Sequence, residues 1–483
     1  MPARRSEPTG ATQATYREAS FWLDDLAVRG LDDLRPRTAL RADARFDVCL
    51  IGGGLTALWT AYALVAADPG LRIAVLEREI AGFGASGRNG GWCSALFPRS
   101  AASLERLHGR EAAVAMRRAM IDTVDEVGRV VGAEGIDCDF DQGGTVLFAR
   151  DDVQRAAARA DVAEAGAFGV DAFEYWGADD VSRRFGAVGL DGAAPAAVFD
   201  PATARVHPAK LVRGLARVVE ARGVALFERT EVVDFAAGRV RFRALDGSGA
   251  EGTVTARHVI VATEGYGPGL PRVRRRILPI YSLMIATEPL SDAVWDEIGI
   301  AHGQTFSDYR HLLVYGQRTA DNRFAFGGRG AHYHFGSRLD PGFERSDAVF
   351  AHLRRALGEL FPAVGDAAVT HRWGGPLGIA RDWHATVSYN PRTGVGFAGG
   401  YVGDGLSTTN LAGRTLADLV LGRTTESTEL PWANHRSPLW EPEPIRWVLA
   451  NLGITGMSIA DAEERLTRRP SLVARMIGPF TGH

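Results

Sequence analysis

The sequence has a single lysine, Lys210, among 55 lysine and arginine residues, and these basic residues stand against 58 aspartates and glutamates. The formal net charge of −3 gives no general attraction for nucleic acids or anionic lipids, so we expect neither as a partner. Cysteine is also scarce: Cys49, Cys93 and Cys138 lack the spacing of a disulfide framework or a structural zinc site. These features predict a protein of the reducing cytoplasm.

Long hydrophobic runs are absent as well. The longest apolar stretches, such as "LTALWTAYALVAA" from Leu55, are shorter than the roughly 20 residues that cross a membrane, so we expect a buried helix there and no membrane span. The first twenty residues lack the apolar segment of a secretory signal, and we interpret them as a flexible tail. With 46% hydrophobic residues, the 483-residue chain is long enough for two domains or more.

Glycine, by contrast, is concentrated at residues 82–97, "GFGASGRNGGWCSALF". A glycine inside a regular element costs roughly 0.5–1 kcal/mol relative to alanine, so such a cluster indicates that the backbone closely approaches something else. The stretch follows a βαβ pattern that starts at Phe46, in which Gly52, Gly54 and Ala57 form a GxGxxA turn and Glu77 ends the second strand.

This βαβ pattern predicts a dinucleotide site. The glycines allow a pyrophosphate to approach the helix N-terminus, and Glu77 can accept hydrogen bonds from ribose hydroxyls while disfavouring the 2′-phosphate of NADP. A nicotinamide cofactor needs no second glycine-rich loop after the second strand. The stretch at 82–97 therefore favours a longer cofactor, FAD.

The order of strand and helix patterns predicts an α/β fold. We expect a Rossmann-type FAD-binding domain with an interleaved α+β substrate domain built on a mixed or antiparallel sheet. The expected segments are an N-terminal extension, 1–45; FAD-binding parts, 46–135, 201–275 and 371–425; substrate-domain parts, 136–200 and 276–370; and a C-terminal helical tail, 426–483. In the tail, Ser458 and Asp461 predict the start of a second helix.

Further motifs follow in order: "VHPAKLVRGLA" (206–216), "RTEVVDF" with Val232, "VIVATEGY" (259–266) and "GFAGGYVGDGLSTTNLAGR" (396–414). Together with "GASGRNGG" (84–91), they resemble the flavin-dependent amine oxidoreductases of the D-amino-acid oxidase, glycine oxidase and sarcosine oxidase superfamily. The resemblance is closest to the gamma-glutamylputrescine oxidoreductase-like branch and extends from about Phe46 to Arg423.

The resemblance implies FAD-binding residues in six stretches of the chain. They are Gly52, Gly54, Leu55, Thr56, Ala57, Glu77, Arg78, Gly84, Ala85, Ser86, Gly87, Arg88, Asn89, Gly90, Gly91, Val232, Ala262, Thr263, Glu264, Gly403, Asp404, Gly405, Leu406, Ser407, Thr408 and Thr409. Relatives attach flavin through a histidine near the first glycine loop or a cysteine in the C-terminal half. Residues 84–91 contain no histidine and no cysteine follows Cys138, so we expect noncovalent FAD.

The resemblance also implies an activity, the oxidation of a primary or secondary amine to an imine by hydride transfer to flavin. Water hydrolyses the imine, and oxygen is the expected electron acceptor, giving hydrogen peroxide. Two alternatives stay open: a flavin enzyme acting on an amino or hydroxy acid with another acceptor, and a flavin-binding interaction protein whose redox role is vestigial. The oligomeric state is open too.

The candidate catalytic residues are Arg88, Tyr281, Tyr315, Arg329, His332 and Trp373. Sarcosine oxidase relatives place a lysine beside the flavin; Lys210 lies far from the ring in that topology, which leaves Arg88 as the nearest cation. Trp373 can enclose a cationic amine through cation–π contact. His332 and His334 fall on one face of a predicted strand without a third ligand, so we expect no metal.

The position of the carboxylate-binding arginine of amino-acid-using relatives is occupied here by Gly375 and Pro376. Arg329 and Arg372 are the possible substitutes, and the change favours a larger amine or polyamine derivative. Asp404 has two interpretations: a contact to the flavin or an ammonium group, and a cap on the following helix.

Overall fold

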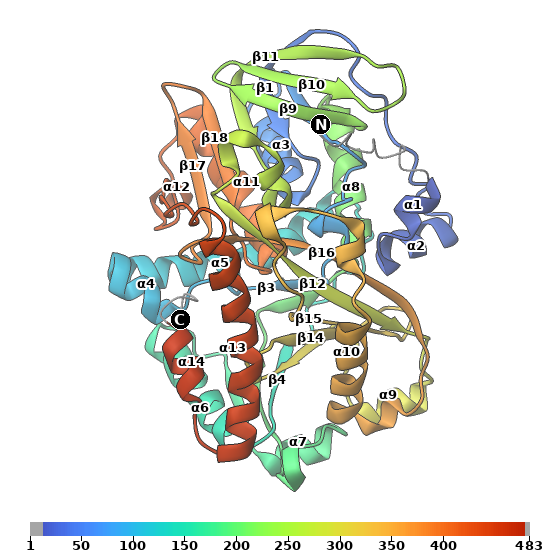
Figure 1. Cartoon of the computed structure of the whole chain (residues 1–483), viewed down its shortest axis with the longest axis vertical. Helices are drawn as coiled ribbons and strands as arrows, with labels where there is room; N and C mark the ends of the chain where they lie inside the picture. Colours follow the sequence, from blue (N-terminus) through green and yellow to red (C-terminus); the bar gives the residue numbers. More distant parts are fainter. Residues whose placement is uncertain (1–12, 479–483) are drawn as a thin grey trace.

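Two sheets of eight strands and a third of two organise residues 13–478, the part of the chain that the computed structural model describes (Figure 1). The small sheet consists of β3 (Trp92–Ser94) and β7 (Thr203–Arg205), which pair antiparallel. The two large sheets correspond to the expected FAD-binding and substrate domains, and the predicted fold class is confirmed.

The first large sheet has a parallel centre in the order β18-β11-β1-β2-β8, with β17 antiparallel at one edge and β9 and β10 attached to β11. Its strands are β1 (Ala44–Ile51), β2 (Ile73–Leu76), β8 (Ala225–Phe227), β9 (Thr230–Ala236), β10 (Arg239–Ala244), β11 (Glu251–Val261), β17 (Thr386–Asn390) and β18 (Val395–Gly399). Parallel strands need covered faces. Three helices supply that cover and a shared core through their apolar faces: α3 (Leu55–Ala67), α8 (Pro208–Ala221) and α11 (Gly405–Leu421).

The second large sheet has the order β16-β12-β15-β14-β13-β4-β6-β5. All of its pairs are antiparallel except β4 with β13, so the sheet is mixed. Its strands are β4 (Thr145–Ala149), β5 (Glu174–Trp176), β6 (Ala196–Asp200), β12 (Ile277–Thr287), β13 (Thr305–Asp308), β14 (Val314–Arg318), β15 (Phe324–Gly328) and β16 (Val369–Ala380). Phe306, Phe324 and Phe361 form part of the aromatic core beneath it.

The remaining α-helices surround the two sheets. They are α1 (Gln13–Arg17), α2 (Phe21–Val28), α4 (Ala101–His108), α5 (Arg110–Ala133), α6 (Asp152–Ala167), α7 (Ala178–Arg184), α9 (Asp292–Ile298), α10 (Asp347–Leu360), α12 (Glu426–Glu429), α13 (Ile445–Thr467) and α14 (Leu472–Ile477). Within residues 13–478, no helix combines the length and the apolar character needed to cross a membrane.

Strand pairing bears on one predicted boundary. The FAD-binding segment expected to begin at residue 371 starts inside β16, which pairs along its length with β12 of the second sheet. The first-sheet strands of that segment, β17 and β18, come after Ala380. By strand pairing, this boundary lies after β16, because β16 belongs to the second sheet and the strands of the first sheet resume at β17.

The flexible tail expected over the first twenty residues is wrong for the part that the structure describes, while residues 1–12 lie outside it. Tyr16 is fully buried, and its hydroxyl donates to Glu79 at 3.0 Å. Ser20 is buried too and caps α2 by accepting a hydrogen bond from the Leu23 amide. The polar composition of the segment concealed these few buried anchors.

The C-terminal tail is helical, as expected, but the break between its last two helices falls after Thr467 and not at the predicted Ser458. Helix α13 runs through Ser458 without a break, so the helix start predicted at that residue is wrong. The second helix, α14, begins after Ser471, whose hydroxyl accepts from the Ala474 amide. Asp461 instead accepts hydrogen bonds from the amides of His311 and Leu312, which ties α13 to the substrate-domain side of the molecule (Figure 1).

Candidate functional site

The GxGxxA turn connects β1 to α3 at the centre of the first sheet. Gly52 has a φ of +104°, and a Cβ on it would lie 2.7 Å from the Ala262 carbonyl oxygen, so no larger residue fits. The amide of Leu55, in the first turn of α3, donates to Ser86 Oγ at 2.9 Å. Thr56 bonds to the Tyr401 hydroxyl at 3.1 Å, and Ala57 is buried. The helix N-terminus and the second glycine loop thus meet directly.

Glu77 lies over this turn at the end of β2. Its carboxylate accepts hydrogen bonds from the amides of Gly53 at 2.5 Å and Glu79 at 2.8 Å. Burial raises the pKa of Glu77 to about 7 in spite of these bonds. Arg78 is half exposed beside it, and Val232 lies half-buried on β9 at the same end of the sheet.

The second glycine loop, residues 84–91, contains a short 3-10 turn at Ala85–Gly87. A Cβ on Gly87 would lie 2.3 Å from the Gly82 carbonyl oxygen, and one on Gly90 would lie 2.4 Å from the ring of Tyr315. Asn89 braces the loop from within, because its amide donates to the carbonyls of Ala85 and Ser86 and its oxygen accepts from Gly91. A close contact to the neighbouring Gly82 thus requires glycine at position 87, and the approach of Tyr315 from the second large sheet requires it at position 90.

Five successive carbonyls of this loop each accept a hydrogen bond from another part of the chain. The donors are Ser20 Oγ to Gly87 (2.9 Å), Trp373 Nε1 to Arg88 (2.8 Å), Trp22 Nε1 to Asn89 (2.8 Å), Gln317 Nε2 to Gly90 (2.6 Å) and the Val206 amide to Gly91 (2.9 Å). We call this set the carbonyl clamp. It joins the N-terminal extension and both domains to one loop.

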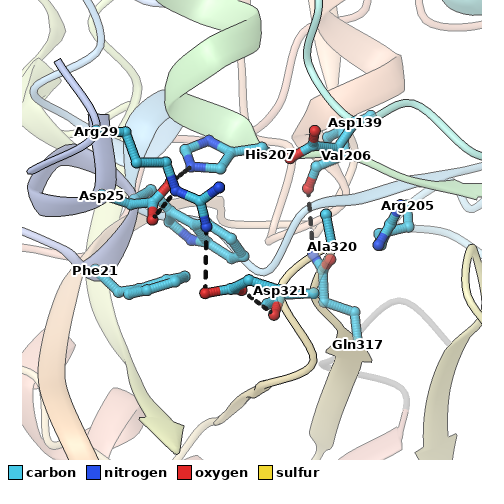
Figure 2. A pocket seen from close by; sticks show the side chains of 12 residues that line it. Phe21, Asp25, Arg29, Asp139, Arg205, Val206, His207, Gln317, Ala320 and Asp321 are labelled. Carbon is cyan, nitrogen blue, oxygen red and sulfur yellow. Dashed lines mark hydrogen bonds and ion pairs between the residues drawn. The ribbon is translucent and has the colours of Figure 1, made fainter. Parts of the chain in front are cut away.

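Behind the clamp lies a small charged pocket between α2, the turn after β7 and the loop after β14 (Figure 2). Arg29 bridges Asp25 and Asp321 at 2.7 and 3.3 Å, and Asp25 lies 3.3 Å from the ring of His207. Gln317 lines this pocket and belongs to the clamp. These contacts hold the end of α2 against the loop after β14, through Asp321, and against the turn after β7, through His207.

Arg88 is buried, with 2% of its side chain exposed, and it lies between the two domains. Its guanidinium donates to the Phe83 carbonyl at 2.5 Å, to the Gly374 carbonyl at 3.1 Å and to Glu344 at 2.6 Å. Burial raises the pKa of Glu344, although Arg88 opposes the shift. The arginine therefore has a carboxylate partner that the sequence did not reveal.

Tyrosines surround the same region. The Tyr315 hydroxyl bonds to Ser282 at 2.9 Å, and the Tyr281 hydroxyl accepts from the Asp340 amide at 3.4 Å. Tyr266 lies against Gly84, where a Cβ would meet its ring at 3.3 Å. Burial raises the pKa of Tyr315 and Tyr281, and that of Tyr266 to about 12, so all three phenols are neutral near pH 7.

Arg329 and Asp404 form a second pair of opposite charges. Arg329 follows β15 and donates to the Val402 carbonyl at 2.6 Å. Burial raises the pKa of Asp404 to about 6, while the guanidinium of Arg329 lowers it. Asp404 occupies the position before α11, but its side chain makes no capping hydrogen bond. The arrangement favours the interpretation of Asp404 as a contact residue over that of a helix cap.

The first turn of α11 presents the remaining predicted cofactor contacts. The hydroxyls of Ser407, Thr408 and Thr409 donate to the carbonyls of Ser94, Asp404 and Leu406, respectively. The preceding Gly403 has a φ of +111°. Leu406 is buried. Helix α11 begins at Gly405, so the backbone amides of its first turn have no partner within the helix and point toward the turn at Gly403 and Asp404.

The turn after β11 carries Ala262, Thr263 and Glu264. The amide of Ala262 donates to the Ile51 carbonyl at 2.9 Å, which places this turn beside the GxGxxA turn. Thr263 Oγ1 is buried without a hydrogen-bond partner among the described residues. An unsatisfied polar atom beside two helix N-termini and a glycine cradle fits an extended, hydrogen-bonding group such as FAD.

Two candidates take unexpected places. Trp373 is buried and binds the Arg88 carbonyl while packing against Trp22 at 6.4 Å, so it braces the loop instead of enclosing an amine. The strand predicted through His332 and His334 is wrong, because β15 ends at Gly328 and Gly330 takes a φ of +132°. His332 is exposed and bonds to Asn451 of α13 at 3.2 Å.

Other residues from the sequence have structural surroundings. Arg372 is exposed on β16. Cys49 and Cys93 are buried free thiols, and burial raises the pKa of both. Ser20, Trp22, Gln317 and Glu344 escaped sequence reasoning because their partners lie far away in the chain and no motif marks them.

Comparisons with known proteins match this arrangement. The family model described as FAD dependent oxidoreductase matches residues 47–419. The chain is 30% identical over 388 residues to the probable oxidoreductase OrdL of Haemophilus influenzae, across 78% of this chain and 83% of that protein. It is 30% identical over 397 residues to gamma-glutamylputrescine oxidoreductase of Escherichia coli, across 80% and 86%. Glycine oxidase from Geobacillus kaustophilus has the same fold, with a TM-score of 0.67, 19% identity and coverage of 82% and 100%.

Glu264 gives the site a testable pH dependence. Its carboxylate accepts from the Tyr401 amide at 2.9 Å, yet burial raises its pKa from 4.5 to about 7. Between pH 4.5 and pH 7, the Glu264 carboxyl ionises more readily in the unfolded chain than in the folded protein, so rising pH destabilises the folded state. We expect Glu264→Gln to match the wild type near pH 4.5 and to exceed its free energy of unfolding by up to about 3 kcal/mol at pH 8. Urea unfolding of the FAD-saturated proteins measures the difference.

The matched control is Glu251→Gln, at an exposed position on β11. This variant should keep a constant offset from the wild type across the same pH range. An offset for Glu264→Gln that is equally constant would contradict a raised pKa at Glu264.

Proposed function

Because the chain belongs to the FAD dependent oxidoreductase family, we propose that it oxidises a primary or secondary amine to an imine, which water hydrolyses. FAD, when bound, would supply the redox chemistry of this two-electron oxidation, with oxygen as the proposed final acceptor and hydrogen peroxide as its product. The protein supplies orientation, charge balance and exclusion of water. The similarity to gamma-glutamylputrescine oxidoreductase supports an amine of extended, polar character.

The cofactor contacts proposed from the motifs fall on three neighbouring turns. The N-terminus of α3 and Ser86 are suited to the pyrophosphate, and Glu77 to the adenosine ribose. Thr263 offers an unsatisfied hydroxyl, and the amides at the start of α11 suit the carbonyls of the flavin ring. We propose that the other FAD-binding residues expected from the sequence contact the same cofactor.

The FAD is proposed to be noncovalent. Cys93 is the thiol nearest in sequence to the glycine loop, and burial raises its pKa, which disfavours the reactive thiolate. When the purified yellow protein is precipitated with acid, we expect its flavin to remain in the supernatant, where absorbance measures it. Flavin that stays with the washed precipitate would contradict this proposal.

The observation that carries the amine proposal is the charge balance of the two buried arginines. Arg88 is paired with Glu344 at 2.6 Å, and Arg329 lies beside Asp404. A substrate carboxylate gains little from an arginine that a carboxylate already neutralises. Glu344, in contrast, can share its charge with a substrate ammonium group, and the phenols of Tyr281 and Tyr315 provide polar walls.

One observation favours the second candidate, an amino-acid substrate. Arg329 Nη2 donates to a single carbonyl, that of Val402, so its guanidinium retains donors for a carboxylate fork. The fold similarity to glycine oxidase is compatible with either substrate. A vestigial interaction protein has weaker support, because residues on both sides of the proposed cofactor site form tight, specific contacts.

We propose oxygen as the acceptor although the one lysine of the chain lies away from the glycine loop. Lys210 Nζ pairs with Asp139 at 2.8 Å at the start of α8, away from the glycine loop. If oxygen is the acceptor, Arg88, Arg329 or the substrate ammonium must supply the nearby positive charge. A cytoplasmic location likewise remains a prediction from the scarcity and buried state of the cysteines.

An anaerobic substrate panel tests the function. We expect an amine or polyamine derivative to bleach the 450 nm flavin band, whereas α-amino acids and hydroxy acids should do so at least about tenfold more slowly. Air is then readmitted and peroxide is measured, which separates an oxidase from a dehydrogenase. Rapid bleaching by amino acids alone would favour the second candidate, and no bleaching by any class would contradict both.

Arg88 and Glu344 provide the mutational test. Arg88→Met leaves a buried carboxylate unpaired, a change that costs about 3–5 kcal/mol in comparable buried pairs, so we expect flavin reduction by the amine to slow at least about tenfold. Glu344→Gln should raise the amine KM and improve the relative rate with a carboxylate substrate. Stopped-flow reduction and reoxidation measure both effects.

The control is Arg183→Met on α7, which breaks an exposed pair with Asp180. It should alter neither rate. If Arg88→Met also leaves reduction and reoxidation unchanged, Arg88 has no part in the reaction.

A further inference from the structure

Three histidines from distant parts of the chain gather at one place outside the proposed flavin site. His108 is the last residue of α4, His384 lies between β16 and β17, and His435 lies between α12 and α13. One ring nitrogen of each lies within 4.8 Å of a ring nitrogen of each of the others. The proposed oxidation uses none of these rings.

Hydrogen bonds fix which nitrogen two of these rings can offer. His384 Nδ1 lies 2.7 Å from the Ala385 carbonyl oxygen, which can only accept, so Nδ1 carries the proton. His435 Nε2 lies 2.7 Å from the carboxylate oxygen Asp382 Oδ2. This oxygen also only accepts, so Nε2 carries the proton of His435. The lone pairs therefore lie on His384 Nε2 and His435 Nδ1. A carbonyl or carboxylate behind each ring is the usual support of a metal-binding histidine.

The free nitrogen of His384 is an independent sign of a missing ligand. The residue has 0% exposure, and its Nε2 is buried with no hydrogen-bond partner among the described residues. A buried, unsatisfied imidazole nitrogen is costly, and an atom placed between the three rings would satisfy it.

The rings of His384 and His435 stack at 3.9 Å with 21° between their planes, so one of the two rings turns out of the stack when both bind one ion. Phe97 packs edge-on against His384 at 5.6 Å. Asp382 also accepts from the His384 amide at 3.2 Å, while its own carbonyl accepts from Arg99 at 2.6 and 3.0 Å. The negative charge of Asp382 thus lies beside the site, and Arg99 is bound to the main chain.

We propose that His108, His384 and His435 bind a divalent transition-metal ion, with zinc as the best match. Three neutral imidazoles are a common ligand set for Zn²⁺, and a tetrahedral ion completes its coordination with water. Asp382 acts as a positioning residue through His435. The sequence predicted no metal because the ligands belong to three distant segments without a spacing motif.

Beyond hydrogen bonds such as those from Arg99 to the Asp382 carbonyl and between His435 and the Asp382 carboxylate, the metal would connect three segments of the chain directly. These are the end of α4, the loop after β16 and the chain that leads into α13. The carbonyl of His384 also lies 3.4 Å from the position a Cβ would take on Gly400, next to the turn that leads to α11. Zinc should therefore stabilise the junction between the C-terminal tail and the first sheet.

The test uses tag-free, FAD-saturated protein that has been treated with a chelator and dialysed. Isothermal titration with Zn²⁺ should show one site per chain, and added Zn²⁺ should raise the thermal midpoint. We expect His108→Ala and His384→Ala to weaken zinc binding at least tenfold and to abolish the rise. Asp382→Asn should weaken binding tenfold or more through His435.

His302→Ala is the matched control, because His302 is an exposed histidine outside the cluster. It should bind zinc as the wild type does. His108 is exposed as well, so His108→Ala keeps the test valid if His384→Ala fails to fold; the flavin spectrum reports folding in each case. No stoichiometric binding by the wild type, or unchanged binding by His108→Ala, would overturn the proposal.

Discussion

The carbonyl clamp is the constraint on which the rest of the site depends. A loop rich in glycine has many accessible conformations, and ordering it is costly in entropy. Here the carbonyls of residues 87–91 are bound one after another by donors from the N-terminal extension, β14, β16 and the segment after β7. Because these donors come from both domains, the loop also fixes how the two sheets meet.

Charge pairing within the proposed substrate pocket follows from that geometry. The clamp holds the main chain at Arg88, and its side chain then reaches Glu344 of the second domain at 2.6 Å. A buried guanidinium without a partner would be strongly destabilising, and so would a buried carboxylate. The ion pair leaves little net charge between the two side chains at the proposed substrate site.

Local patterns predicted much of this protein, because their chemistry is contained within short segments. The GxGxxA turn, Glu77 and the loop at residues 84–91 lie where strand and helix periodicity places them. Residues that act across the fold escaped prediction. Trp373 and His332 were both candidate catalytic residues, but Trp373 donates to the Arg88 carbonyl and His332 bonds to Asn451 of α13. Aromatic and histidine side chains occur in cores, hydrogen-bond networks and active sites alike, so their role depends on contacts that the sequence does not show.

The order in which the clamp can close has a consequence for folding. Ser20 and Trp22 leave the ribosome early, yet the carbonyls they bind belong to a loop whose other donors include Gln317 and Trp373. Contacts between residues so far apart in sequence carry a large loop-closure entropy and form slowly. Most of the chain must therefore be synthesised before the loop is fully held. Productive capture of the cofactor should then be largely a post-translational event, completed when the second sheet has formed.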